Sequence, residues 1–153
     1  MQNPSFRERL LGTWRLVSCV QRDEQGRESY PFGEDADGFL VYTADGFVSA
    51  HLEQRNRPRH QSPDFTAGTP DEYKTMGQGY LAYCGRYALD EETRRLAHTM
   101  TVSLFPNWLG STQVRVASFE GDRLILRTEV PILVDEKMQT GELVWRRASE
   151  VRE

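Results

Sequence analysis

Short runs of alternating apolar and polar residues, separated by tight turn signals, fill most of this chain. The clearest case is residues 38–43 and 47–53, which flank Ala44-Asp45-Gly46. Asp-Gly between two alternating runs is a strong hairpin signal, because both positions tolerate the positive φ that the turn needs. Successive hairpins place each strand beside its neighbour in the sequence. The pattern therefore predicts an antiparallel sheet whose strands follow the chain order.

The same pattern along the chain predicts an all-β fold. Eight strands in meander order are a common way of closing a sheet into an up-and-down barrel. We expect one domain over residues 1–153 that is an eight-stranded antiparallel barrel. The predicted strands are residues 12–22, 38–43, 47–53, 80–90, 95–104, 112–120, 123–129 and 141–147.

Two short helices are expected outside the barrel. Asn3 is the expected cap of an N-terminal helix that stops before Gly12. The other helix lies between the third and fourth predicted strands. It begins at Thr69, whose spacing from Glu72 is that of a capping box, and runs to about Met76. The long connection before it, residues 54–68, is typical of a functional loop such as a lid over a cavity.

Composition limits the partners that this chain can have. Its 153 residues are 38% hydrophobic and 27% charged, with a net charge of −4. These values fit a soluble globular protein and give no general attraction to nucleic acid or anionic membranes. No apolar run reaches the ~20 residues of a membrane span, and no apolar signal core begins the chain. We expect a cytoplasmic protein without nucleic-acid or membrane partners, and the sequence leaves a homodimer open.

Gly12-Thr13-Trp14 opens the first predicted strand, and Arg146 and Arg147 end the last. These residues resemble the GxW signature of lipocalins and the arginine that packs on its tryptophan. A longer ordered set spans about residues 10 to 147: LLGTWRLVS, YPFGEDADGFLVYTADGFVSA, GTPDEY, YLAYCGRY, SLFPNWLGSTQVR, GDRLIL and LVWRR. This set resembles the bacterial and fungal lipocalin-like domain family. The resemblance implies a calycin-type β-barrel around a central cavity, and it implies little about chemistry because fold does not specify function.

The segment from His98 to Arg115 holds the side chains best suited to catalysis. Alternation places His98 in an otherwise apolar row, made up with Leu96, Met100, Val102 and Leu104. We expect this row to face the cavity. His98 would then act as general acid or base, because histidine titrates near neutral pH.

Arg115 and Tyr83 complete the predicted catalytic set with His98. Both would stabilise negative charge on a substrate oxygen. The alternatives are that His98 is a hydrogen-bonded interior residue, that Arg115 is a surface or ion-pair residue, and that Tyr83 belongs to the core.

Further cavity residues are expected to contact a ligand. Asn107 and Trp108 fit a barrel rim, and Tyr87 shares a face with Tyr83. Ser49 and His51 lie on one face of the third predicted strand, whose orientation the pattern leaves open. The full predicted ligand-binding set is Trp14, Ser49, His51, Tyr87, Met100, Asn107, Trp108 and Gln113.

Familiar motifs for catalysis, metals and cofactors are missing from the sequence. There is no GxSxG elbow or P-loop, and the three histidines have no metal-ligand spacing. We therefore expect no metal and no cofactor. The chain is predicted to bind a small hydrophobic, oxygenated molecule in the barrel cavity. It would act on that molecule as a cofactor-independent isomerase, cyclase or dehydratase (a lyase) of secondary (natural-product) metabolism. The alternative is a non-catalytic lipocalin-like binding or carrier protein.

Overall fold

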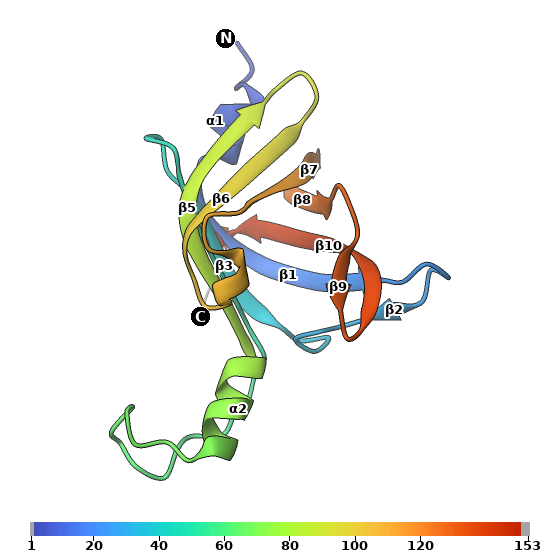
Figure 1. The fold of residues 1–153 in the computed structure, drawn as a ribbon. Coiled ribbons are helices and arrows are strands. Elements are labelled where there is room, and N and C mark those ends of the chain that lie inside the picture. The colour runs from blue at the N-terminus through green and yellow to red at the C-terminus, as the bar shows by residue number, and fades with distance from the viewer. Residues whose placement is uncertain (1, 151–153) are drawn as a thin grey trace.

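The barrel closes through hydrogen bonding between its first and last long strands. The computed structural model describes residues 2–150, so residues 1 and 151–153 of the predicted domain lie outside it. β1 (Gly12–Arg22) pairs with β10 (Lys137–Arg147), and all neighbouring strands are antiparallel (Figure 1). This confirms the predicted eight-stranded antiparallel barrel. Between them lie β3 (Asp37–Tyr42), β4 (Phe47–Glu53), β5 (Tyr80–Asp90), β6 (Arg95–Ser103), β7 (Thr112–Glu120) and β8 (Arg123–Thr128).

Two short strands outside the predicted set extend the sheet at one end of the barrel. β2 (Glu28–Ser29) pairs with β1, and β9 (Ile132–Val134) forms a hairpin with the start of β10. The hairpin turn is Asp135-Glu136, with φ of 50° and 63°. Because this turn uses positive φ without glycine, the sequence lacks its usual signal. For this reason β10 begins four residues before the predicted strand at 141–147.

Both helices form, and their caps explain where they begin. α1 (Phe6–Leu10) is capped by Ser5 and not by Asn3, because Ser5 and Glu8 form a reciprocal capping box. α2 (Pro70–Gln78) begins after Thr69 as predicted, with the expected capping box, and runs two residues beyond the predicted end. None of the described helices has the length and apolar character needed to cross a membrane.

α1 covers one end of the barrel. The Arg9 side chain donates to the Gly121 carbonyl at 3.0 Å, and the Arg7 side chain donates to the Ala44 carbonyl at 3.2 Å. Below the helix, the Trp14 indole donates to the Leu10 carbonyl at 2.9 Å. The Arg147 guanidinium lies 3.9 Å from the Trp14 ring centroid, so Arg147, and not Arg146, is the packing arginine. This end of the barrel is closed.

α2 and the loop before it extend away from the barrel (Figure 1). No residue of α2 is buried. The loop is bonded to the helix itself, since the Gly68 amide donates to the Tyr73 hydroxyl at 2.9 Å and the Gln61 amide to the Glu72 carboxylate at 3.0 Å. In this arrangement the segment is a projecting arm, and the predicted lid over the cavity is not seen.

Candidate functional site

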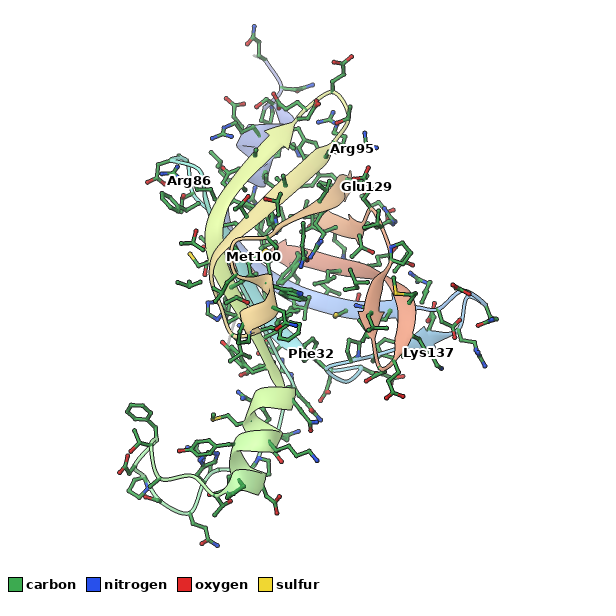
Figure 2. The ribbon with its side chains drawn as sticks, viewed as in Figure 1. Phe32, Arg86, Arg95, Met100, Glu129 and Lys137 are labelled. Carbon is green, nitrogen blue, oxygen red and sulfur yellow. The ribbon has the colours of Figure 1, made fainter. Side chains whose placement is uncertain are left out.

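The barrel interior holds a small, mostly apolar cavity that opens toward the end opposite α1. Its free volume is about 80 Å³, and Phe32, Trp108 and Ile132 also line a wider groove of about 550 Å³ at the mouth. Figure 2 shows Phe32 at this end of the barrel. Leucines and Trp145 make up much of the inner wall. A small molecule with an apolar body fits such a surface.

A buried histidine between two tyrosines forms the polar part of the interior. The Nε2 atom of His98 lies 2.8 Å from the Tyr42 hydroxyl, and its Nδ1 atom lies 2.8 Å from the Tyr83 hydroxyl. Strands β3, β5 and β6 supply one residue each. Both ring nitrogens of His98 are therefore satisfied, as a buried imidazole requires.

Burial keeps all three of these groups uncharged. The His98 side chain is 1% exposed, and desolvation, aided by the nearby Arg115 charge, lowers its pKa to about 3. Desolvation also raises the pKa of the Tyr42 and Tyr83 hydroxyls, although Arg115 opposes the rise at Tyr83 through its charge and hydrogen bonding. The sequence predicted that His98 titrates near neutral pH. In the structure its imidazole instead stays uncharged until the pH falls to about 3, the value of its pKa.

Arg115 brings a positive charge to the same cavity. It is half-buried on β7, and its Nη2 atom donates to the Gln113 amide oxygen at 2.7 Å. No ion pair joins it to a carboxylate within the described part of the chain. Among the described residues that line the cavity, Arg115 is the only one with a formal charge. Gln113 itself does not line the cavity, and its amide contacts Arg115 instead.

A bulge in β6 divides the predicted apolar row. Gly85 of β5 is opposite Met100 and Cys84 is opposite Val102, so Thr101 is the extra residue. Leu96, His98 and Met100 face inward, whereas Val102 and Leu104 are 59% and 48% exposed. The prediction that all five residues face the cavity was therefore wrong for the last two, because the extra residue reverses the alternation.

Ser49 and His51 lie on the outer face of the barrel wall. Val48, Ala50 and Leu52 of the same strand are buried inside. On the outside, the Nδ1 atom of His51 lies 2.7 Å from the Tyr80 hydroxyl. The structure thus places Ser49 and His51 away from the cavity, because the strand turns its apolar face to the core.

The other predicted site residues divide between the core and the mouth. Trp14 packs at the closed end, and Tyr87 donates to the Thr43 carbonyl at 2.7 Å behind Tyr42. Met100 is fully buried without lining the cavity. Trp108 lines both the cavity and its mouth, while Asn107 lines the mouth alone.

Tyr42 is the principal residue absent from the predicted site. It shares the inward face of β3 with Leu40, which alternation alone could have indicated. Cys19, which does line the cavity, was likewise absent from the predicted site, and burial raises the pKa of its thiol to about 12. In the described residues, no three His, Cys, Asp or Glu side chains gather as a metal-ion site. The arrangement offers neutral hydrogen-bonding groups and one cation to an oxygen-bearing ligand.

Known proteins resemble this chain over most of its length. The family model described as a lipocalin-like domain matches residues 11–148. A protein of Aspergillus oryzae (strain ATCC 42149 / RIB 40), named as a 4'-hydroxy-3'-methoxypropiophenone carrier protein, is 35% identical over 106 residues, which cover 65% of this chain and 96% of that protein. Among solved structures, a mutant of the fluorescent protein UnaG aligns with a TM-score of 0.40 and 12% identity, covering 94% of this chain and 99% of that one.

Proposed function

Because this chain belongs to the lipocalin-like domain family, we propose that it binds a small aromatic, oxygenated molecule in its barrel as a non-catalytic carrier. The observation that carries the proposal is the hydrogen-bonded row Tyr42–His98–Tyr83, with Arg115 beside it, at one side of a mostly apolar cavity. The Aspergillus relative supports the same class of ligand, since it is named as a carrier of a hydroxyphenyl ketone.

The chemistry of the wall suits an aryl ketone. Leu40, Leu52 and Leu126 offer apolar surface to a ring, and Trp108 at the mouth offers an aromatic edge or face. Tyr83 and Arg115 offer hydrogen bonds to oxygen. Ligand sites commonly combine an apolar wall with a few oriented polar groups in this way.

Binding is better supported than proton transfer. An effective general base has a pKa near the working pH. His98, with a pKa of about 3, is a weak base at neutral pH. The finer prediction of a cofactor-free isomerase, cyclase or lyase of secondary metabolism stays a prediction, as do a cytoplasmic location and a homodimer.

The proposal is tested by titrating the protein with 4'-hydroxyacetophenone and following tryptophan fluorescence, because Trp108 and Trp145 line the cavity. We expect saturable binding that Tyr83→Phe weakens about 10-fold, the equivalent of one hydrogen bond of ~1.4 kcal/mol. Tyr80→Phe is the matched control, since that hydroxyl bonds His51 outside the barrel and its loss should leave the affinity unchanged.

Two results would count against a carrier. No saturable binding of any aryl ketone would reject the cavity as its site. Conversion of the ligand, detected by mass spectrometry in the wild type and absent in His98→Gln, would favour an enzyme over a carrier. Recovery of the ligand unchanged after binding would support the carrier.

A further inference from the structure

We propose that Arg115 makes the cavity selective for an anionic oxygen, and that a hydroxyaryl ketone binds there as its phenolate with that oxygen held by Arg115 and Tyr83. The inference rests on the proposed function, because it concerns the same cavity. It adds the charge state and the orientation of the ligand, which neither the fold nor the relative specifies.

The positive charge of Arg115 has no negative partner in the described structure. A guanidinium keeps its charge at any pH that a protein survives, and a partly desolvated charge is costly unless an anion balances it. Its side chain donates to the neutral amide of Gln113 at 2.7 Å and also hydrogen-bonds the neutral Tyr83 hydroxyl, so neither partner carries a negative charge. A ligand anion would supply the missing charge.

The groups that face Arg115 from the surrounding strands are all uncharged. β6 presents Leu96 and His98, and β8 presents Leu126 and Thr128. The other titratable groups of the interior are the Tyr42 and Tyr83 hydroxyls and the Cys19 thiol, whose protonated forms burial favours.

Charged residues on the neighbouring strands pair with one another away from the cavity. Arg95 forms an ion pair with Glu129 (Figure 2), and Arg127 pairs with Glu142 at 2.8 Å. No carboxylate of these pairs is therefore left to balance Arg115.

Hydrogen-bond accounting fixes the direction of the Tyr42–His98–Tyr83 row. Among described residues, the fully buried Tyr42 hydroxyl has one partner, the Nε2 atom of His98. Since an unpaired buried O–H is costly, Tyr42 donates to Nε2. A neutral imidazole that accepts at Nε2 carries its proton on Nδ1, and it donates that proton to the Tyr83 oxygen. The hydroxyl proton of Tyr83 is then free to point into the cavity.

Two donors thus converge on the same space. A phenolate accepts from Tyr83 and from Arg115 and balances the guanidinium charge, and each bond in the row polarises the next. A neutral phenol cannot balance the guanidinium charge of Arg115. On binding, the phenol loses its proton to solvent and no other bond changes. An acyl group para to the hydroxyl makes this ionisation easier.

The test uses the different absorption bands of phenol and phenolate. 4'-Hydroxyacetophenone is bound at a pH about one unit below its own pKa in water. We expect the phenolate band in the wild-type complex, because an adjacent cation lowers an acid's pKa by about 1–3 units and the Tyr83 hydroxyl adds a second donor. Together they should outweigh the desolvation that keeps Tyr83 itself protonated. Arg115→Lys should keep the phenolate band, whereas Arg115→Met should show the phenol band.

4'-Methoxyacetophenone serves as the ligand control, because it keeps the ketone and cannot ionise. At the same pH we expect it to bind the wild type about 10-fold more weakly than the hydroxy ketone. A pKa lowered by about two units, less the one unit by which the pH lies below the free pKa, leaves about one unit of preference. The two ketones should bind Arg115→Met about equally.

The outcomes separate this inference from the proposed function. Tight binding of both ketones with the phenol band retained would overturn the inference alone, and would place the carbonyl oxygen at Arg115. Failure of both ketones to bind would overturn the proposed function and the inference with it. The wild-type spectrum alone shows whether the bound ligand is phenol or phenolate, even if Arg115→Met does not fold.

Discussion

The hydroxyl oxygen of Tyr42 lies 2.8 Å from the Nε2 atom of His98, although 56 residues separate them in the chain. The contact crosses the barrel interior from β3 to β6 and is completely shielded from solvent. It joins core stability to the site, because the same imidazole positions Tyr83 on its other side.

Removing the Tyr42 hydroxyl should destabilise the fold. Tyr42→Phe leaves the Nε2 atom of His98 buried without a donor, which costs about 1–3 kcal/mol in the free energy of unfolding. Tyr80→Phe is the matched control, because it breaks a tyrosine–histidine hydrogen bond of 2.7 Å on the outer surface. It should cost less than about 0.5 kcal/mol. Urea unfolding measures both losses. Equal losses would contradict a stabilising role for the buried Tyr42–His98 hydrogen bond.

Stability should fall as the pH drops from 7 to 5. Unfolded His98 takes up a proton near its ordinary pKa of 6.5, whereas folded His98 does so only near 3. The unfolded state therefore binds more protons in this window, and its protonation costs folding about 2 kcal/mol by pH 5. The loss continues toward pH 3, below which this contribution is constant.

The variant His98→Gln isolates that effect, because glutamine is neutral and can still donate and accept hydrogen bonds. The free energy of unfolding, measured by urea titration at pH 7 and pH 5, should change about 2 kcal/mol less in the variant than in the wild type. The same pH slope in both proteins would show that His98 is not the group responsible.

Gly85 should not tolerate a side chain. A Cβ at this position would lie 1.7 Å from the Thr99 carbonyl oxygen, where β5 and β6 approach at the bulge. Gly85→Ala therefore forces the strands apart, and we expect a loss of roughly 3 kcal/mol or more in the free energy of unfolding. Gly77→Ala is the control, since its Cβ would meet nothing within 4 Å and the site is helical. Alanine there should be neutral or stabilise by up to about 1 kcal/mol. Thermal unfolding compares the two.

Arg147 should matter far more than its neighbour Arg146. Its guanidinium stacks on Trp14 and donates to the carbonyls of Leu11, at 2.6 Å, and Arg9. Arg147→Ala should cost about 2 kcal/mol, through lost hydrogen bonds and a lost cation–π contact. Arg146→Ala removes an exposed arginine and should change the free energy of unfolding by less than about 0.5 kcal/mol. A comparable loss in both variants would show that the closing contact is unimportant.

Local sequence patterns predicted the eight main strands and both helices well, because the turns and caps that bound them are local. The Asp-Gly hairpin and the Thr69 capping box formed as expected. The hairpin at Asp135-Glu136 was missed, since non-glycine residues there adopt positive φ. Which arginine closes the barrel also needed the fold, because Arg146 and Arg147 are adjacent in sequence and differ only in the face they occupy.

By itself, the sequence determined the order of the strands, the inward positions of His98 and Tyr83, and the family. Only the tertiary structure decided that Val102 and Leu104 turn outward, because an unpaired residue at the bulge reverses the faces beyond it. It also decided that Tyr42 joins His98, since closing the barrel brings together strands that are not neighbours in the sheet. The pKa of His98 follows from that enclosure, because desolvation depends on everything packed around the ring and not on its neighbours in sequence.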